Sequence, residues 1–260
     1  EKIAKNTYGD NVPFSMHGII RSRDCCIKST ALAIQIAKET GARIHLMHLS
    51  TYQEVAMLKD LMYGNVKTRQ ISGEACIPHL YFSESFYAQK GPFLKCNPAV
   101  KTEKDRLALV QALESGVITT VGTDHAPHEL SAKGNQYFKC ASGLPSVQFS
   151  LLALLDLWKR KEITLETIAK VTSTNVAERF RIKNRGRIEE GYAADLAIVN
   201  PTCRTLVTKD LIASSCKWSP FENHIFSSAV VHTIVNGNLV VENGKLVSEE
   251  KGQALEFDRE

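Results

Sequence analysis

The chain has 260 residues, of which 43% are hydrophobic and 23% are charged, a composition typical of soluble globular proteins. Its formal net charge of +4 is small for this length and no Lys/Arg-rich run occurs, so nucleic-acid binding is not indicated. The most apolar stretch, residues 149–157, contains Ser150 and Asp156 and is too short to cross a bilayer, so no membrane association is expected.

The seven cysteines are an odd number and include no Cys-X-X-Cys pair, and the adjacent Cys25 and Cys26 are poorly placed for a structural disulfide. Free thiols in a reducing cytoplasm fit this usage best. The first residue is Glu1 rather than Met, and residues 1–5 resemble the middle of a helix. We therefore expect the chain to belong to a longer protein.

The first two-thirds of the chain alternate helical and strand patterns. Residues 27–38 carry apolar side chains at helical spacing, which predicts a helix that ends before Gly41. The short apolar run at 43–50 then predicts a strand with His48 at its carboxyl end. Because side chains alternate along a strand, His45 and His48 should point to opposite faces.

Further helices and strands are predicted downstream. Residues 52–63 return to helical spacing, and residues 66–71 indicate a strand. An aromatic-rich loop is expected around His79, and a short extended segment at 93–96 ends at Asn97. Asn97 precedes a proline and is therefore expected in an extended turn.

The next predicted helix, residues 102–113, leads to an apolar, β-branched run at 117–121 that is typical of a buried parallel strand. The polar stretch 122–128 follows directly and contains Asp124, His125 and His128. A carboxylate and two imidazoles so close together suit metal binding and proton transfer. The alternative, a polar loop that caps a helix, is less favoured because a strand precedes the stretch and a second histidine closes it.

The last third of the chain changes character. The Gly/Ser/Lys-rich span 129–146 is expected to be a mobile loop beside the active site, and three helices are predicted at 147–161, 165–171 and 175–180. From about residue 185, glycines punctuate short β-rich runs, and Asn236-Gly237 predicts a hairpin turn. Residues 1–183 are therefore predicted to form an α/β domain, and residues 184–260 a small all-β unit with a tail.

About four strand–helix units are present by this count, whereas an eight-stranded α/β barrel needs ~250 residues by itself. Polar signals recur where the predicted strands end, at His48, Asn97 and the pair Asp124 and His128. A hydrolytic metal site needs imidazole and carboxylate ligands from separate strands, because one strand cannot surround an ion. Each signal alone is weak, since a strand histidine is more often a packed core residue and Asn-Pro is more often only a turn.

Taken together, these residues resemble the dihydroorotases, within the cyclic amidohydrolase superfamily that also includes hydantoinases and allantoinases. The matching pieces are His-Leu-Ser-Thr at 48–51, Asn97-Pro98, Thr-Asp-His-Ala-Pro-His at 123–128 and the signature at 186–196. The Asp-His-Ala-Pro-His form favours dihydroorotase over its relatives. The resemblance covers residues 13–244 and matches the C-terminal part of the family, which implies a partial (β/α)8 barrel of about four strand–helix units followed by a small all-β unit.

The resemblance also implies roles for particular residues. His48 would ligate one zinc ion of a binuclear site, and Asp124 would ligate the other and carry a proton between the bridging hydroxide and the ring nitrogen. Asn97 and His128 would contact the small-molecule substrate. The implied reaction is the reversible, zinc-dependent hydrolysis of L-dihydroorotate to N-carbamoyl-L-aspartate in pyrimidine biosynthesis, in the cytoplasm. A homodimer is compatible with the sequence, which does not fix the oligomeric state.

The departures from the family pattern limit these expectations. Residues 99–101 are Ala-Val-Lys where the family usually has Pro-Leu-Arg. The His-X-His of the first barrel strand, the bridging lysine or aspartate and the fifth-strand histidine are absent, so the chain would supply only two metal ligands. We expect this chain alone to be inactive.

No role is assigned to His17, His79 or His125, the last because it directly follows Asp124 and should point away from the metals. Two alternatives stay open. One is a hydantoinase or allantoinase that acts on another cyclic amide, and the other is a non-catalytic relative that acts through protein interactions.

Overall fold

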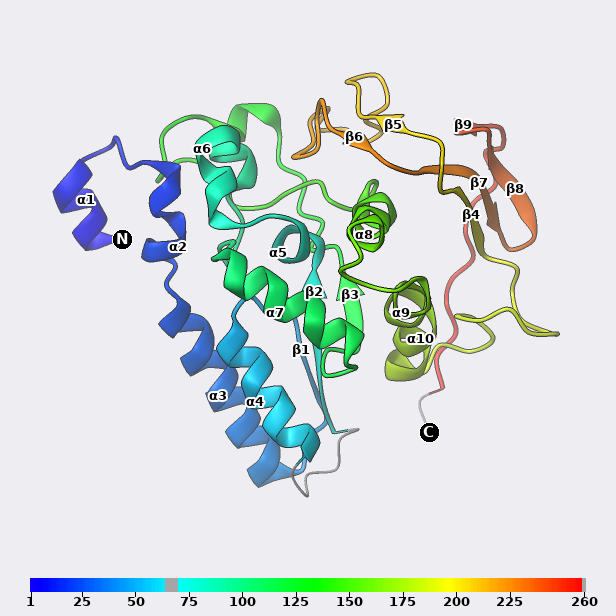
Figure 1. Cartoon of the computed structure of the whole chain (residues 1–260), viewed down its shortest axis with the longest axis horizontal. Helices are drawn as coiled ribbons and strands as arrows, with labels where there is room; N and C mark the ends of the chain where they lie inside the picture. The colour runs from blue at the N-terminus through cyan, green and yellow to red at the C-terminus, as the bar shows by residue number, and fades with distance from the viewer. Residues whose placement is uncertain (64–69, 259–260) are drawn as a thin grey trace. The chain divides into compact units, whose positions relative to one another are not determined.

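The computed structural model of the chain describes residues 1–63 and 70–258. The chain folds into two compact units (Figure 1). The first comprises Glu1–Ser150 with Thr208–Glu222, and the second comprises Leu151–Val207 with Asn223–Glu260. Helices and strands are mixed as in an α/β protein, which was predicted, while the domain boundary between residues 183 and 184 stays a prediction.

The first unit is built on a parallel sheet of three strands in the order β1-β2-β3. These strands are β1 (Ile44–Leu46), β2 (Ile71–Cys76) and β3 (Thr120–Gly122). Leu46 pairs with Gly73, and Cys76 pairs with Gly122, so the carboxyl ends of the strands lie toward one edge of the sheet. A partial barrel requires such a sheet, and the barrel itself stays a prediction.

Parallel neighbours need long crossover connections, and helices occupy the chain between these strands. Helix α4 (Tyr52–Tyr63) follows β1, while α5 (Ile77–Tyr81) and α7 (Glu103–Glu114) lie between β2 and β3. The remaining helices and 3-10 turns of this unit are α1 (Lys2–Tyr8), η1 (Phe14–Met16), α2 (His17–Ile20), α3 (Arg23–Thr40), η2 (Glu84–Phe86), α6 (Tyr87–Lys90), η3 (Gly91–Leu94) and η4 (Leu130–Lys133).

Three predicted helices are confirmed, and each carries a local signal. α3 ends at Gly41, whose φ of 73° is in the left-handed region that glycine adopts without strain. α4 spans the predicted residues 52–63. α7 begins with a capping box, in which the Thr102 hydroxyl accepts from the Asp105 N–H and the Asp105 carboxylate accepts from the Thr102 N–H.

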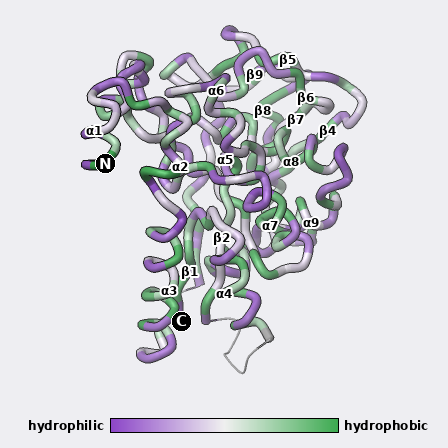
Figure 2. The backbone as a smooth tube through the Cα atoms, turned by 60° about the vertical axis from the view of Figure 1, so that its left-hand side comes forward, coloured by the Kyte–Doolittle hydropathy of each residue, from purple (hydrophilic) through white to green (hydrophobic). Residues whose placement is uncertain are grey.

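Helix α3 has one buried side, which its residue spacing explains. Its buried residues are Thr30, Ile34 and Ala37, which recur three or four positions apart and so lie on one side of the helix. Figure 2 shows hydrophilic and hydrophobic residues alternating along α3 as the helix turns. α3 packs against α4, and α4 packs against α7, so these helices are neighbours beside the sheet (Figure 1).

Two predicted strands are displaced. Residues 66–69 of the strand predicted at 66–71 lie outside the described residues, and β2 begins only at Ile71. Gly73, Glu74 and Ala75 have weak strand propensity, but β2 forms because a strand pairs with it on each side. The run predicted as a strand at 117–121 likewise enters the sheet only at its end, through β3.

Two other predictions are wrong. The segment predicted to be extended at 93–96 begins in the 3-10 turn η3, which takes residues 91–94 and has Pro92 near its start, and the backbone is extended only from Lys95. His79 lies not in a loop but in the short helix α5, with Pro78 in the first turn. Proline suits both positions because its fixed φ matches a helical turn and its missing N–H would have no partner there.

The second unit contains helices as well as strands. Its helices are α8 (Ser150–Lys159, whose first residue belongs to the first unit), α9 (Leu165–Ala169) and α10 (Asn175–Phe180), with a π turn η5 (Lys170–Thr174). An antiparallel sheet in the order β4-β7-β8-β9 is formed by β4 (Leu196–Asn200), β7 (Ala229–Val235), β8 (Asn238–Glu242) and β9 (Lys245–Leu246), and β5 (Thr205–Leu206) pairs with β6 (Ile225–Phe226).

The predicted hairpin of this sheet is confirmed. Asn236 and Gly237 have φ of 49° and 84° between β7 and β8, as a type I′ turn requires.

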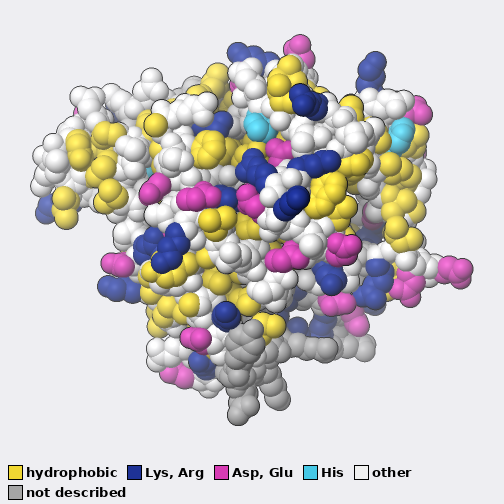
Figure 3. All heavy atoms as spheres, viewed as in Figure 1, with side chains coloured by type: hydrophobic (Ala, Val, Ile, Leu, Met, Phe, Trp, Pro, Cys, Tyr) yellow, Lys and Arg dark blue, Asp and Glu magenta, His cyan; other side chains and the backbone are white. Residues whose placement is uncertain are grey.

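On the face drawn in Figure 3, Lys and Arg side chains are interspersed with Asp and Glu. None of the helices in the described part of the chain is long and apolar enough to span a membrane.

The carboxylate of Asp105 joins three helix N-termini of the first unit. Arg23, at the start of α3, donates to it through Nη1 (2.8 Å) and Nη2 (2.7 Å). The Tyr52 N–H at the start of α4 donates over 3.0 Å, and the Thr102 hydroxyl at the cap of α7 donates over 2.6 Å. Burial alone would raise the pKa of Asp105, but the hydrogen bonds from Arg23 and Thr102 lower it below its usual value.

A buried histidine anchors the segment before α3. The Cys96 carbonyl lies 2.7 Å from Nε2 of His17 and can only accept, so Nε2 carries the proton. Nδ1 of His17 then accepts from the Tyr137 hydroxyl, also over 2.7 Å. Burial lowers the pKa of His17 to about 4, so the ring is neutral at pH 7.

Replacing Asp105 with Asn should lower the free energy of unfolding at pH 7 by about 2–4 kcal/mol, because Arg23 loses its anionic partner in a buried pair. The depressed pKa makes the ionised carboxylate stabilising above its unfolded pKa, and this stabilisation is lost as the pH falls through the folded pKa. Urea unfolding at pH 7 and at pH 3 should therefore show a smaller difference between variant and wild type at pH 3. The exposed Asp60→Asn on α4 is the control, and equal losses in the two variants would contradict this account.

His17 should make the protein less stable as the pH falls from 6.5 to 4. In that window the unfolded chain takes up a proton that the folded chain does not, so unfolding is favoured by up to about 3 kcal/mol at pH 4. His17→Gln keeps a donor and an acceptor but does not titrate, so its unfolding free energy should depend less on pH in this window. His125→Gln, at an exposed histidine, is the control, and an unchanged slope in His17→Gln would show that the idea is wrong.

Candidate active site

His48 and Asp124 follow the carboxyl ends of two strands of the parallel sheet and are close enough to interact electrostatically. His48 lies two residues beyond β1, and Asp124 lies two residues beyond β3. Their φ angles are 42° and 47°, so both adopt the left-handed conformation that non-glycine residues rarely occupy. Such conformations cost of order 1–3 kcal/mol and cluster at functional sites, which makes these two equivalent positions candidates for function.

The prediction that His45 and His48 alternate along one strand rests on a strand that is too long. β1 ends at Leu46, and the positive φ of His48 takes its backbone out of the strand conformation. His45 instead belongs to the sheet, where its Nδ1 lies 2.7 Å from the Ser72 hydroxyl and its Nε2 lies 3.3 Å from the Thr120 hydroxyl.

Sequence reasoning missed Glu74, which lies on β2 between the two outer strands. Its Oε2 lies 3.7 Å from Nε2 of His45, and its Oε1 accepts from the Cys76 thiol at 3.5 Å. The carboxylate rests over Gly122, where an added Cβ would lie 2.5 Å from Oε1. Glycine at that position therefore provides the room for the carboxylate. No sequence signal identified Glu74, because the strand was predicted to lie several residues earlier.

The charges at this edge of the sheet act on one another. Burial raises the pKa of Asp124, His48 beside it lowers the pKa, and Glu74 raises it again. Burial would also raise the pKa of Glu74, but hydrogen bonds from His45 and Cys76, together with the nearby His48, lower it. Glu74 is therefore the anionic member of the group, and Asp124 is the carboxylate that takes up a proton more readily.

Asn97 is exposed and precedes Pro98 through a cis peptide bond. The Pro98 carbonyl accepts from Nε2 of the buried His79 at 2.8 Å. Burial lowers the pKa of His79 to about 4, with a smaller contribution from His48, so His79 is neutral and close to the candidate site. His79 thus links Asn97, by way of Pro98, to the neighbourhood of His48.

His128 is half-buried and held at three points. Nε2 of its ring donates to the Ser142 carbonyl at 3.1 Å, its own carbonyl accepts from Nε1 of Trp218 at 2.8 Å, and the ring packs on Gly143. His125 is exposed, and its Nδ1 accepts from the Val147 N–H at 3.2 Å. The two histidines of the loop are therefore held differently.

His48 and Asp124 offer an imidazole nitrogen and a carboxylate oxygen, donors that zinc accepts. In the described ranges, 1–63 and 70–258, no group of three or more His, Cys, Asp or Glu side chains is arranged to hold a metal ion. His48 and Asp124 are two such donors, whereas a catalytic zinc ion takes three from the protein.

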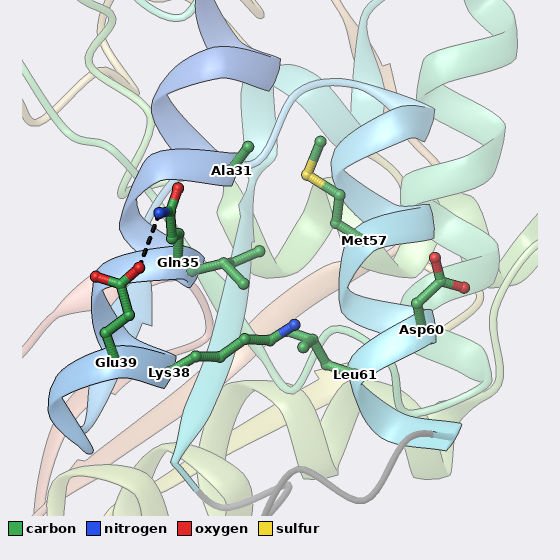
Figure 4. A pocket seen from close by; sticks show the side chains of 8 residues that line it. Ala31, Gln35, Lys38, Glu39, Met57, Asp60 and Leu61 are labelled. Atoms are coloured by element: carbon green, nitrogen blue, oxygen red, sulfur yellow. Dashed lines mark hydrogen bonds between the residues drawn. The ribbon is translucent and has the colours of Figure 1, made fainter.

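A pocket of about 600 Å³ lies elsewhere, between α3 and α4. Figure 4 shows Gln35 donating to Glu39 (2.8 Å) and Lys38 extending across the pocket toward Leu61. These residues lie in the later halves of both helices, toward the amino ends of the strands, whereas parallel α/β folds place their chemistry at the carboxyl ends. This pocket is therefore separate from the candidate active site.

The sequence of the chain is similar to those of known proteins. The model of the amidohydrolase family matches residues 16–240. The chain is 32% identical to a dihydroorotase of Methanosphaera stadtmanae over 80% of the chain and 47% of that protein. It is 33% identical to an allantoinase of Bacillus velezensis over 82% of the chain and 46% of that protein.

Solved structures of similar fold are also found. The L-hydantoinase (dihydropyrimidinase) from Arthrobacter aurescens superposes with a TM-score of 0.81 at 25% identity, over 88% of this chain and 51% of that one. The dihydropyrimidinase from Brevibacillus agri superposes with a TM-score of 0.82 at 21% identity, over 95% and 54%, and so supports the fold alone. The chain spans about half the length of the relatives that it matches. Because the family model matches residues 16–240, this chain is a member of the amidohydrolase family.

Proposed function

We propose that the protein is a zinc-dependent dihydroorotase that interconverts L-dihydroorotate and N-carbamoyl-L-aspartate in pyrimidine biosynthesis. The observation that carries the proposal is the equivalent, left-handed placement of His48 and Asp124 beyond parallel strands, with an electrostatic interaction between them. Dihydroorotases among the 32–34% identical relatives support the substrate assignment. Because the chain spans about half of those relatives, the activity is proposed for the whole protein.

His48 would hold one zinc ion and Asp124 a second, and the remaining ligands would come from outside the described residues. When bound, zinc lowers the pKa of a coordinated water molecule and polarises the carbonyl group. Asn97 and His128 bind the substrate. Exposure of Asn97 and the fixed ring of His128 suit these roles.

Asp124 moves the proton. As water attacks the ring carbonyl, the carboxylate of Asp124 accepts a proton from it, and the C–N bond breaks as that proton passes to the ring nitrogen. Burial and the neighbouring Glu74 favour the protonated form of Asp124, while His48 opposes them, so the group can hold a proton between the two steps. Ring closure is the same sequence in reverse.

A second cyclic amide substrate is favoured by specific observations. An allantoinase is 33% identical to the chain, and hydantoinases superpose on it. The non-catalytic alternative is favoured only by the incomplete donor set among the described residues.

The purified whole protein, of which this chain is a part, should turn over dihydroorotate faster than hydantoin or allantoin when it is supplied with zinc. Asp124→Asn should lower kcat by about 10²-fold or more, because it removes the proton carrier. His125→Asn, one residue along and bonded to Val147 instead, is the matched control and should change kcat by less than about threefold.

Faster turnover of allantoin or hydantoin would replace the substrate assignment with the second one. A protein that binds no zinc and hydrolyses none of the three amides would support the non-catalytic alternative.

A further inference from the structure

Lys133 is a buried ammonium group in the span that follows the candidate site. Lys133 is the last residue of η4 and is 3% exposed. Nζ donates to the carbonyls of Ala141 (2.8 Å), Lys95 (3.2 Å) and Gly143 (3.2 Å). An ammonium group has three N–H donors, so the three carbonyl oxygens match it in number.

This burial is costly and needs a reason. Burial lowers the pKa of Lys133 to about 8, and the nearby thiols of Cys140 and Cys96 and the ammonium of Lys95 are the titratable groups around it. Within the described residues no carboxylate pairs with Lys133, and its hydrogen bonds go to backbone carbonyls. A charged group buried without a counter-ion is retained only where the hydrogen bonds that it makes matter to the fold or to a site.

One of the residues whose carbonyl binds Lys133, Gly143, also lies against the ring of His128. Gly143 donates its N–H to the Lys95 carbonyl at 2.9 Å and offers its own carbonyl to Lys133, so both sides of this residue are fixed. Gly143 has a φ of 152°, and an added Cβ would lie 2.9 Å from Cδ2 of His128 and 2.7 Å from Ala126. The backbone of Gly143 is therefore the surface on which the His128 ring rests.

Two further contacts tie Lys133 to the same histidine. The carbonyl of Ser142, between the two Lys133-bound residues Ala141 and Gly143, accepts from the His128 ring. The Trp218 ring lies 5.4 Å from Nζ of Lys133, and its Nε1 donates to the His128 carbonyl. The partners of His128 at its ring (Ser142) and at its carbonyl (Trp218) are therefore both next to groups that Lys133 contacts.

A second lysine secures the far side of the same loop. Nζ of Lys95 donates to the Tyr137 carbonyl at 2.7 Å and to the Cys140 carbonyl at 2.6 Å. The Lys95 carbonyl meanwhile accepts from both Lys133 and Gly143. Lys95 therefore holds the span at 137–140, and Lys133 holds it at 141–143.

We propose that Lys133 is the positioning residue for His128: its ammonium group clamps three carbonyls, fixes Gly143, and so sets the imidazole of His128 at the substrate. The clamp follows from the contacts above, while its consequence for the substrate rests on the function proposed for His128. Because its ammonium group is engaged by backbone carbonyls, Lys133 acts on the substrate only through the loop that it holds.

Hydrogen exchange tests the clamp without reference to activity. In Lys133→Met, which keeps the bulk of the stem but no donor, the amides of Gly143 and Ala126 should exchange at least tenfold faster than in wild type. In Lys133→Gln, which keeps two donors, the exchange rates of these amides should lie between those of the wild type and of Lys133→Met. This second variant keeps the test valid if Lys133→Met misfolds. Lys139→Met removes an exposed lysine of the same span and should leave both amides unchanged. Unchanged exchange in both Lys133 variants would overturn the proposal.

A double-mutant cycle tests the route through His128. If Lys133 acts on the substrate through that ring, Lys133→Met should raise KM with little change in kcat, and its loss of kcat/KM should largely vanish in a His128→Asn background. Losses that simply add would show that Lys133 does not act through His128. If the protein hydrolyses no cyclic amide, the function proposed for it fails while faster exchange at Gly143 still establishes the clamp.

Discussion

Parallel pairing of β1, β2 and β3 is the constraint on which the candidate site depends. β1 and β3 are not neighbours, so His48 and Asp124 act on one another only because β2 holds their strands in register on either side. The same strand delivers Glu74 between them, and Gly122 provides the room for its carboxylate. A shift of β2 by one residue would turn Glu74 to the opposite face and remove the anion that raises the pKa of Asp124.

The surrounding chain stabilises this edge with buried polar groups rather than with apolar contacts alone. Asp105 gathers three helix N-termini, His17 joins the segment before α3 to the Cys96 carbonyl, and Lys133 holds residues 141–143, on which the His128 ring rests. Each of these groups is costly to bury and is matched by partners in number and type. Such networks specify one arrangement, because an alternative packing would leave a buried donor or acceptor without a partner.

Features that depend on nearby residues could be predicted from the sequence. Apolar spacing and capping predicted the helices at 27–38, 52–63 and 102–113, and Asn236-Gly237 predicted the hairpin. Non-local features could not be predicted. The position of β2 depends on pairing with strands 27 and 46 residues away (Ile44 with Ile71, Glu74 with Thr120), and so Glu74 was missed. Lys133 was missed because a lysine in a Gly/Ser/Lys-rich span is expected in solvent, whereas this one is buried and donates to carbonyls 8, 10 and 38 residues away.

The central claim is that His48 and Asp124 belong to one metal centre, and zinc content measures it most directly. Zinc should be determined by elemental analysis in the purified whole protein and in its His48→Gln, Asp124→Asn and control His125→Gln variants, after dialysis against the same metal-free buffer. The account predicts bound zinc in the wild type and in His125→Gln, and a marked loss in both of the other variants. Zinc retained at the wild-type level in His48→Gln and Asp124→Asn would contradict it.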